Sequence, residues 1–382
     1  MKKLLFITPR NPFSGRYSGD VIRANKFIHF LSKKYNLQVI SLDKNNIKKK
    51  NKIIKYRGFK NSNFLSKIFN IIFSVLSLQP LQVGYFFSPS IKNYVKDNYQ
   101  KYDFIFLQSI RTVQYVPNNI ATRCILDMGD LTSINYRQTF KRLSFLNPLK
   151  IVYLIESILV KKYEKKCFNR FNKILLFSKK EINSVEKKFR KKLFQINFGI
   201  DKIKSLYKFN KKNNKIIFIG NIKYAPNREA CLEFINKILP KILFKYPKVQ
   251  FHIIGEISKI DKLFVMKKRN VKIFDQVDNL EPYLSKVICG LANLNISSGV
   301  QTKLLTYMSY GIPSVCSEQV SQNFDAIKKS KINFYKDDDE MVELIFKFME
   351  NKKFSVSSSR RALKTISFFK WNNIFLKLNK II

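Results

Sequence analysis

The segment SSGVQTKLLTYMSYG, residues 297–311, decides the fold because it places a capped helix directly after the apolar run VICGLANL. Ser297 and Ser298 are residue types that cap a helix N-terminus. Gly299 lets the backbone come close to a ligand, and the helix is expected to begin at about Val300. A buried strand that leads into a helix in this way is the repeating unit of an α/β fold.

Outward from this segment, short apolar runs alternate with helical patterns along the chain. Continuous apolar strands that alternate with helices predict parallel sheets covered on both faces. The predicted strands of the N-terminal half are residues 4–8, 37–42, 103–108, 124–128 and 173–178. The predicted strands of the C-terminal half are residues 215–220, 251–255, 271–274, 287–294, 312–317 and 332–335.

The polar, basic stretch 201–214 separates the two series of strands and is predicted to be a linker. The chain has 382 residues, enough for two domains of about 100 to 200 residues each. We therefore predict two Rossmann-like α/β domains facing across a cleft, residues 1–200 and residues 215–366. Two such domains favour a ligand site at the C-terminal ends of their strands. A terminal helix over 367–382 would carry an apolar face made of Trp371, Ile374, Phe375 and Leu378.

The charge balance is strongly basic, with 72 Lys and Arg against 26 Asp and Glu and a net charge of +46. Such a field attracts anions, including nucleotides, anionic lipid headgroups and nucleic acid. The excess is mostly Lys, which shares AT-rich codons with the abundant Asn, Ile and Phe, so genome bias is an alternative explanation. No nucleic-acid-binding module is recognisable and the basic residues form no single stripe, so nucleic acid is not an expected partner.

Metal and disulfide chemistry are not expected. The five Cys include no CxxC pair and are expected to be buried free thiols in a reducing compartment. The only two histidines, His29 and His252, lie in a helical and a strand-like pattern and are expected to be packed side chains. A zinc enzyme is therefore not expected.

The N-terminus MKKLLFITPRNP is predicted to be a first strand and not a signal peptide. No stretch of about 20 apolar residues occurs, since residues 64–87 and 143–160 are interrupted by polar side chains. We expect a cytoplasmic protein that is peripheral on the inner face of the cell membrane. The aromatic stretch KIFNIIFSVLSL, residues 67–78, is expected to bind an anionic membrane surface, and the alternative is that it belongs to the core.

Lys303 falls within the first turn of the helix predicted from residue 300. A helix N-terminus offers free N–H groups and about half a positive charge, and an added lysine makes a phosphate site. The alternative is an ordinary capped helix with a solvated lysine. On the phosphate interpretation, Lys303→Ala is expected to weaken binding of a phosphate ligand while leaving fold stability nearly unchanged.

Two further loops follow predicted strands of the N-terminal half. The loop TPRNPFSGRYSGDVIR, residues 8–23, contains several Arg and Gly but no GxGxxG, so no dinucleotide cofactor is inferred. Its alternative interpretation is a long surface loop. The sequence DMGD, residues 127–130, places carboxylates after a strand, where they can recognise hydroxyl groups. The alternative there is helix capping by Asp130 or Thr132.

Motifs in a consistent order resemble the retaining GT-B glycosyltransferases of family 4, also called group 1 glycosyltransferases, and in particular a bacterial branch linked to exopolysaccharide or exosortase-associated gene clusters. The C-terminal motifs are FIGNIKYAPNREACLEFINKILPKI (218–242), FHIIG (251–255), VKIFDQVDNLEPYL (271–284) and SGVQTKLLTYMSYGIPSV (298–315). The N-terminal motifs are SGDVIR (18–23), ILDMGDLTS (125–133), IESILVKKYEKK (155–166), LLFSKKE (175–181) and NFGID (197–201).

The resemblance implies transfer of a sugar with retention from an NDP-sugar donor to a glycan or lipid-linked acceptor, in cell-surface polysaccharide biosynthesis and without a metal or other cofactor. It implies catalytic roles for Asp130, facing the sugar or acceptor, and for Gly19, approaching the donor phosphates or sugar. Lys303 and the backbone of 299–301 would hold the diphosphate, and residues 274–277 would flank the base. The implied substrate-binding residues are Arg23, Asp127, Lys223, Phe274, Gln276, Val277, Ser298, Gly299, Val300, Gln301, Lys303 and Thr306.

The sequence departs from the family pattern at two places. Family members usually carry two glutamates spaced eight apart, where this chain has Ser298 and Thr306. A paired Arg and Lys after the first strand of the donor domain is also missing, with Asn221 and Lys223 nearby. The alternative function is therefore a non-catalytic sugar-nucleotide-binding or scaffold protein with a decayed GT-B fold. The resemblance also implies that the terminal helix crosses back onto the N-terminal domain.

Overall fold

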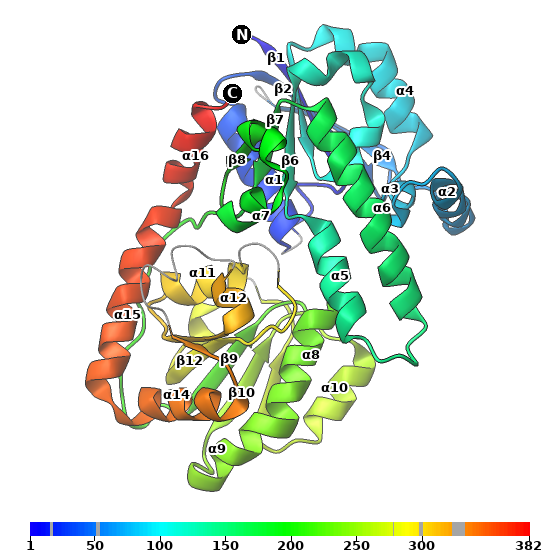
Figure 1. The fold of residues 1–382 in the computed structure, drawn as a ribbon. Coiled ribbons are helices and arrows are strands. Elements are labelled where there is room, and N and C mark those ends of the chain that lie inside the picture. The colour runs from blue at the N-terminus through cyan, green and yellow to red at the C-terminus, as the bar shows by residue number, and fades with distance from the viewer. Residues whose placement is uncertain (16–17, 51–53, 278, 298–300, 323–332) are drawn as a thin grey trace. The chain divides into compact units, whose positions relative to one another are not determined.

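A computed structural model describes the chain except for residues 16–17, 51–53, 278, 298–300 and 323–332 (Figure 1). The chain folds into two compact units. Unit 1 consists of Met1–Asn197 together with Phe375–Ile382, and unit 2 consists of Phe198–Ile374. Each unit is built on its own sheet, so the fold is the predicted α/β type with two Rossmann-like halves.

In the described part of unit 1 the sheet has eight strands in the order β3-β4-β2-β1-β5-β6-β7-β8. The described pairs are parallel except β3 with β4, which gives one antiparallel edge on a parallel sheet. The strands are β1 Lys3–Thr8, β2 Asn36–Asp43, β3 Ile47–Lys50, β4 Ile54–Lys60, β5 Phe104–Gln108, β6 Cys124–Gly129, β7 Lys173–Leu176 and β8 Leu193–Gln195.

Helices connect these strands because apolar side chains recur on one face at helical spacing. In α1, for example, Val21, Ala24, Phe27, Ile28 and Leu31 are buried. The helices of unit 1 are α1 Gly19–Leu31, α2 Phe64–Leu76, α3 Leu81–Tyr85, α4 Pro89–Asn98, α5 Thr132–Arg142, α6 Leu149–Arg170 and α7 Lys179–Ser184. Short 3-10 turns are η1 Tyr99–Lys101, η2 Ile110–Tyr115, η3 Asn118–Arg123 and η4 Lys187–Lys192.

Among the described residues of unit 2 the sheet has six strands in the order β11-β10-β9-β12-β13-β14, and their pairs are all parallel. The order reverses between β9 and β12, and ligands of open α/β sheets bind at such a switch point. The strands are β9 Lys215–Ile219, β10 Gln250–Ile254, β11 Val271–Phe274, β12 Val287–Ala292, β13 Ser314–Ser317 and β14 Phe334–Tyr335.

The helices of unit 2 lie between these strands and after the last one. They are α8 Ala225–Glu233, α9 Leu239–Lys245, α10 Lys259–Met266, α11 Thr302–Ser309, α12 Glu318–Gln322, α14 Asp338–Glu350 and α15 Lys352–Ile366. A π-helical turn, η5 Phe234–Ile238, joins α8 to α9, and 3-10 turns are η6 Glu281–Tyr283 and η7 Ser367–Phe369. The chain ends in α16, Trp371–Asn379.

All five cysteines are free and buried, as predicted. Within the described ranges, no helix is both long enough and apolar enough to cross a bilayer.

Candidate functional site

The buried ring of Tyr307 fixes helix α11 at the switch point of unit 2. The Tyr307 hydroxyl accepts a hydrogen bond from the backbone N–H of Ile219 (2.9 Å) and donates to the carbonyl of Leu291 (3.0 Å). Gly290 has no side chain there, and a Cβ atom at this position would lie 2.5 Å from the ring. The start of α11 is thereby held beside the ends of β9 and β12.

Lys303 in the first turn of α11 is buried, with 5% of its surface exposed. Its Nζ donates to Oδ1 of Asn227 (2.6 Å) and lies 4.0 Å from the centre of the Phe218 ring. Burial lowers the pKa of Lys303 to about 7. The alternative of a solvated lysine is therefore wrong, and because the side chain is buried, Lys303→Ala is no longer expected to leave fold stability nearly unchanged.

No described carboxylate forms an ion pair with Lys303, so a desolvated amine faces only neutral partners. Gly220 follows β9 with φ +156°, and a Cβ atom at Gly220 would lie 3.1 Å from Nδ2 of Asn227 and 3.5 Å from Cε of Lys303. The glycine therefore leaves the lysine and the asparagine uncovered by a side chain at the end of the strand. This arrangement suits an anion that approaches the backbone closely.

Asn227 was not singled out as a site residue from the sequence, although it lies in the quoted Pro-Asn motif. Its Nδ2 donates to the carbonyl of Asn221 (2.8 Å), so the side chain ties the loop after β9 to Lys303. Asn227 is 8% exposed. The signal that could have revealed it is a polar amide in the first turn of a helix that follows a predicted strand.

Lys223, which was predicted to bind substrate, forms an ion pair within the chain. Its Nζ lies 2.6 Å from Oε1 of Glu256, and Nδ2 of Asn221 donates to Oε2 of the same carboxylate (3.0 Å). Half of the Lys223 side chain is exposed, so this is a surface ion pair of small energetic weight. Substrate binding by Lys223 therefore stays a prediction.

The residues predicted to flank the base differ in their surroundings. The Phe274 ring packs edge-on against Tyr283 with ring centres 4.8 Å apart and contacts His252 at 5.2 Å. Val277 is half-buried and packs, like Phe274 and Tyr283, against the buried apolar residues of unit 2. Gln276 is exposed. His252 is buried as predicted, and burial lowers its pKa to about 4. Phe274 and Val277 therefore offer an apolar wall, and Gln276 an exposed amide.

Helix α11 begins at Thr302, two residues later than expected. Gln301 occupies the N-cap position, and its Nε2 donates to Oγ of Ser297 (2.9 Å). The hydroxyl of Thr306 donates to the carbonyl of Thr302 (3.0 Å). The predicted contacts at Ser298, Gly299 and Val300 lie outside the described residues.

In unit 1, Gly19 is the first residue of α1 and lies in a network anchored to the sheet. Oγ1 of Thr8 donates to Oε1 of Gln108 (2.6 Å), and Nε2 of Gln108 donates to the carbonyl of Asp20 (2.7 Å). Asp20 also pairs with Arg10. Burial acts to raise the pKa of Asp20, but the charge of Arg10 and the hydrogen bonds from Ser18 and Arg10 together lower the net pKa. The start of α1 is thus held at the end of β1, as expected.

Arg23 and Asp127, predicted to bind substrate, form a buried bidentate pair. Nε of Arg23 lies 2.7 Å from Oδ2 of Asp127, and Nη2 lies 2.8 Å from Oδ1. The guanidinium also donates to the carbonyls of Asn197 (2.9 Å) and Ile196 (3.1 Å). Because both side chains are 2–3% exposed and their polar atoms are occupied inside the protein, they tie α1 to β6 and do not face a ligand. This corrects their predicted role.

Asp130 belongs to a group of buried carboxyls that includes two residues missed from the sequence, Glu164 and Glu181. Oε1 of Glu181 accepts the N–H of Leu131 (2.8 Å), and Glu164 accepts both the N–H (3.1 Å) and the hydroxyl (2.6 Å) of Ser133. Oδ1 of Asp130 and Oε2 of Glu181 are buried without a partner among the described residues. Both glutamates lay in the quoted motifs YEKK and SKKE, where they looked like ordinary charged residues.

The environment keeps these carboxyls protonated more readily than usual. Burial, and then the neighbouring charge of Glu181, raise the pKa of Asp130 well above its ordinary value. Burial likewise raises the pKa of Glu164 and of Glu181 to about 7. The capping alternative for Asp130 and Thr132 is wrong, because Leu131 occupies the N-cap position of α5 and the side chain that accepts an N–H of its first turn is Glu164. A carboxyl that holds its proton near neutral pH can serve as a donor or acceptor to a sugar hydroxyl.

These raised pKa values predict how stability depends on pH. Between about pH 4.5 and 7 the folded state binds more protons than the unfolded chain, so the free energy of unfolding should fall as the pH rises through this window. Glu181→Gln should reduce that slope by on the order of 1 kcal/mol per pH unit. Thermal unfolding from pH 5 to 8 measures it. Glu186→Gln, at an exposed glutamate whose pKa is lowered by Lys165 and Lys188, is the control and should leave the slope unchanged.

Within the described ranges, no group of three or more His, Cys, Asp or Glu side chains is arranged to hold a metal ion.

Comparison with known proteins locates a family match in unit 2. Residues 213–351 match the family Glycosyl transferases group 1. Over 281 residues the chain is 23% identical to an uncharacterized 44.6 kDa protein in the cps region of Klebsiella pneumoniae, an alignment that covers 72% of this chain and 70% of that protein.

Solved structures are similar over the whole chain. Sucrose-phosphate synthase from Thermosynechococcus elongatus has a TM-score of 0.72 at 10% identity, covering 100% of this chain and 98% of that one. WaaG, a glycosyltransferase involved in lipopolysaccharide biosynthesis, has a TM-score of 0.69 at 10% identity and 99% coverage of both chains. Anabaena HepE, solved in complex with UDP and glucose, has a TM-score of 0.65 at 12% identity, covering 100% and 99%.

These structural likenesses, at 10–12% identity, establish the fold, and the match to the glycosyltransferase family lies in residues 213–351. Together they show that the chain has the GT-B fold and that residues 213–351 of unit 2 are similar to the group 1 glycosyltransferases.

Proposed function

We propose that the protein transfers a sugar from an NDP-sugar to a glycan or lipid-linked acceptor, with retention at the anomeric carbon, in the synthesis of cell-surface polysaccharide. The observation that carries the proposal is the buried Lys303, which has Asn227 as its polar partner and lies beneath Gly220 at the start of α11. A desolvated amine beside a helix N-terminus favours a multiply charged anion such as a diphosphate.

The names of similar proteins support the same chemistry. One structural relative was solved with UDP and glucose, and another is a glycosyltransferase of lipopolysaccharide biosynthesis. The sequence relative is a protein in a cps region. Each supports sugar transfer onto a surface polysaccharide as the reaction of this chain.

In the proposed reaction the leaving diphosphate is stabilised by the ammonium of Lys303 and by the free N–H groups of α11, without a metal ion. Asn227 orients the amine through its Oδ1 atom. In unit 1, Gly19 allows close approach of the donor phosphates or sugar at the start of α1, and Asp130 contributes a carboxyl whose pKa is raised well above its ordinary value by burial. Arg23 and Asp127 act only by positioning α1 against β6.

A panel of UDP-, GDP-, ADP- and dTDP-sugars tests the proposal. A donor present at 100 times its dissociation constant should stabilise the protein by about 2.7 kcal/mol, which a thermal-shift assay detects. Release of the nucleoside diphosphate in the presence of a lipid-linked glycan acceptor then measures transfer. Binding without turnover would support the non-catalytic alternative, and the absence of binding by every donor would overturn the proposal.

We further propose that the protein binds the anionic inner face of the cell membrane through α2. The apolar side chains Phe64, Leu65, Phe69, Phe73 and Leu76 are 62–78% exposed, and Ser74 is the buried residue of this helix. The alternative that this stretch belongs to the core is therefore wrong. A contiguous exposed apolar surface of this kind marks an interaction site.

The packing of α2 explains why its apolar side is exposed. A Cβ atom at Gly84 of α3 would lie 2.4 Å from the carbonyl of Asn70 and from Oγ of Ser74, so α3 packs against the polar side of α2. Beside it, Glu156 of α6 accepts the N–H groups of Leu81 (2.7 Å) and Gln82 (3.2 Å) at the start of α3. The first half of α6 and the loop before it also expose apolar side chains, namely Phe145, Leu146, Leu149, Ile151, Val152, Ile155 and Ile158.

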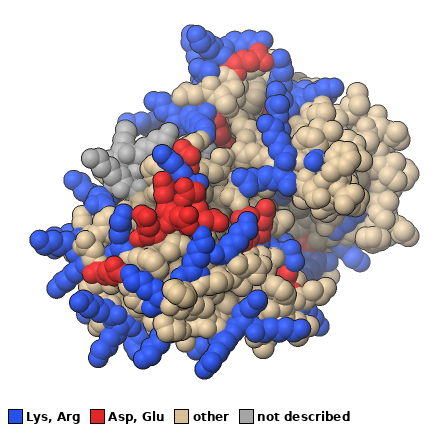
Figure 2. Space-filling model, turned by 60° about the horizontal axis from the view of Figure 1, so that its bottom comes forward, with Lys and Arg blue, Asp and Glu red and all other residues tan. Residues whose placement is uncertain are grey.

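Charge favours a lipid bilayer with anionic headgroups as the partner of this surface. The net charge is +46, and Lys67 of α2 holds its Nζ 4.8 Å above the Tyr85 ring at the side of the apolar face. Figure 2 shows Lys and Arg side chains spread over the face in view, where they cover more area than Asp and Glu. Apolar insertion together with attraction of anionic lipid is how interfacial helices bind.

The double variant Phe69→Ser/Phe73→Ser should lower binding to phosphatidylglycerol-containing vesicles about tenfold or more, because each inserted Phe contributes about 1.5–3 kcal/mol when fully buried. Co-sedimentation with vesicles measures this. The control is Phe244→Ser/Phe368→Ser, two exposed phenylalanines of unit 2, and it should bind like the wild type. Binding should also weaken with added salt. Equal binding to neutral vesicles would contradict the electrostatic part, and unchanged binding of the first variant would place the contact elsewhere.

A further inference from the structure

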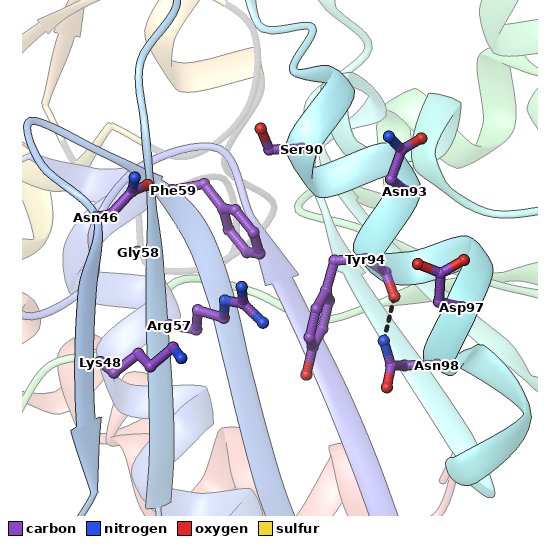
Figure 3. A pocket seen from close by; sticks show the side chains of 10 residues that line it. All are labelled: Asn46, Lys48, Arg57, Gly58, Phe59, Ser90, Asn93, Tyr94, Asp97 and Asn98. Atoms are coloured by element: carbon purple, nitrogen blue, oxygen red, sulfur yellow. Dashed lines mark hydrogen bonds between the residues drawn. The ribbon is translucent and has the colours of Figure 1, made fainter.

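A pocket of about 820 Å³ lies at the antiparallel edge of the unit 1 sheet (Figure 3). Strands β3 and β4 form one wall and helix α4 forms the other. Strand β2 separates β4 from β1, which carries the Gly19 loop, and none of the residues assigned above to donor or acceptor chemistry lines this pocket. Its volume falls within the range of about 300–1,000 Å³ that is usual for small-molecule sites.

Arg57 of β4 is the central cation of the pocket. Its guanidinium carbon lies 4.8 Å from the ring centres of both Phe59 and Tyr94, and Figure 3 shows the side chain reaching from β4 toward Tyr94 on α4. The two ring centres are 5.6 Å apart, so both rings lie on one side of the guanidinium. No described residue accepts a hydrogen bond from Arg57 or forms an ion pair with it, so the N–H groups at its edge remain available.

A second cation lies directly opposite the first. In the antiparallel pair of β3 and β4, Lys48 is the register partner of Arg57. Like charges at directly opposed positions destabilise a sheet. Among the described side chains Lys48 also lacks an ion pair, and Asp97 on the α4 wall forms none either. The pocket therefore combines two cations with one carboxylate, and an anion seated between Lys48 and Arg57 would relieve their repulsion.

The remaining lining suits hydroxyl groups on an apolar support. Asn46, Ser90, Asn93 and Asn98 contribute amides and one hydroxyl, which both donate and accept hydrogen bonds as sugar hydroxyls do. Nδ2 of Asn98 donates to the carbonyl of Tyr94 (2.8 Å), which fixes that amide at the rim. The ring of Phe59 is 4% exposed and forms the floor.

We propose that this pocket binds an anionic sugar unit, one carrying a carboxylate or a phosphate, of the acceptor glycan and holds the polymer at a distance from the transfer site. The inference rests on the proposed function only in treating the bound glycan as an acceptor. A guanidinium edge recognises a carboxylate or a phosphate through two parallel N–H donors, whereas a neutral sugar leaves the two cations unpaired.

Calorimetry on the full chain tests the proposal with four probes: tetragalacturonate, its methyl ester, a phosphorylated maltotetraose and inorganic phosphate. We expect one of the two acidic oligosaccharides to bind at least tenfold more tightly than the methyl ester and than inorganic phosphate. Arg57→Gln should weaken this binding tenfold or more, and Arg57→Lys should weaken it less. Lys60→Gln removes the same charge from an exposed position of β4 that does not line the pocket, and should bind like the wild type.

The two acidic oligosaccharides distinguish a carboxylated sugar from a phosphorylated one. Inorganic phosphate binding as tightly as either would overturn the saccharide assignment, and equal binding by Arg57→Gln and wild type would overturn the site. Binding of the donor nucleotide sugar is measured on the same variants and should be unchanged in Arg57→Gln. If acidic saccharides fail while the donor binds, this inference falls and the proposed function stands; if the donor fails to bind in the wild type, the proposed function falls.

Discussion

Lys303→Met should weaken binding of the donor nucleotide sugar by about 1.5–3 kcal/mol, or roughly 10- to 100-fold, which is the range for a charged hydrogen bond. Methionine keeps the aliphatic stem that packs beneath Gly220 and removes only the ammonium. Titration calorimetry with the best donor of the panel measures the change. A variant that binds as tightly as the wild type would place the phosphate site elsewhere.

The stability of two Lys303 variants separates packing from charge. Lys303→Ala removes a buried stem and leaves a cavity, which should cost about 1–3 kcal/mol of unfolding free energy. Lys303→Met avoids the cavity and also avoids burying an amine, although it leaves Oδ1 of Asn227 without its donor. We therefore expect Lys303→Met to melt close to the wild type, Lys303→Ala to melt lower, and both to lose donor affinity. Equal melting of the two variants would contradict the packing of Lys303.

The lowered pKa of Lys303 allows a second test of the proposed contact between Lys303 and the donor diphosphate. With a pKa of about 7 the amine of Lys303 is largely neutral in the free protein at pH 8, whereas a bound diphosphate favours the ammonium form. Donor binding at pH 8 should therefore take up a proton, and less so at pH 6, where the amine is already charged. Calorimetry in two buffers of different ionisation enthalpy measures the uptake. No uptake at pH 8 would mean that the diphosphate does not reach Lys303.

Thr306 lies one turn further along α11, and its hydroxyl is bonded to the carbonyl of Thr302. A carboxylate there would add a charged acceptor for ribose or sugar hydroxyls, so Thr306→Glu is expected to tighten donor binding. Failure of this variant alone would mean that the pocket is built around threonine and would leave the assignment of Lys303 intact.

Sequence patterns predicted the central strands because a strand buried on both faces is a continuous apolar run, as in LLFIT of β1 and VICGLA of β12. They missed the edge of the unit 1 sheet. Strand β4 reads IKYRGFK, whose basic residues and glycine carry no such run. What holds it is remote in sequence: the hydroxyl of Tyr56 bonds to Ser41 and Asp43 of β2. The three residues of β8 are too short to give any periodicity.

In the candidate site, too, local patterns were predictable from the sequence, whereas contacts between distant residues were not. Lys303 could be placed in a first helical turn from local pattern, but its burial depends on Asn227, 76 residues away. Arg23 and Asp127 looked like free polar groups because the sequence does not show that they pair across 104 residues. Positions near strand ends are thus predictable from the sequence, whereas the state of each charge depends on contacts made only in the fold.

Loss of the terminal helix should have the largest effect on stability. Trp371, Ile374 and Leu378 of α16 are buried, as predicted, and Phe375 stacks on Phe30 with ring centres 4.3 Å apart. Ending the chain before Ser367 exposes the surfaces that these side chains cover, at ~25 cal/mol per Å² of apolar area. The melting temperature should therefore fall markedly, by the equivalent of several kcal/mol. An unchanged melting temperature would mean that the helix contributes no packing.

Single substitutions test this packing without shortening the chain. The Trp371 ring packs on Gly199, where a Cβ atom would lie 2.5 Å from the indole, and the backbones of Ile200 and Trp371 are joined by a hydrogen bond of 3.1 Å. Trp371→Ala should cost about 3–5 kcal/mol, the usual loss for a buried aromatic ring. Gly199→Ala should also destabilise the protein, because the added methyl group must displace the indole. Leu376→Ala, at a side chain of the same helix that is 63% exposed, should cost under about 0.5 kcal/mol. If Gly199→Ala and Leu376→Ala melt alike, the contact between the indole and Gly199 does not contribute to stability.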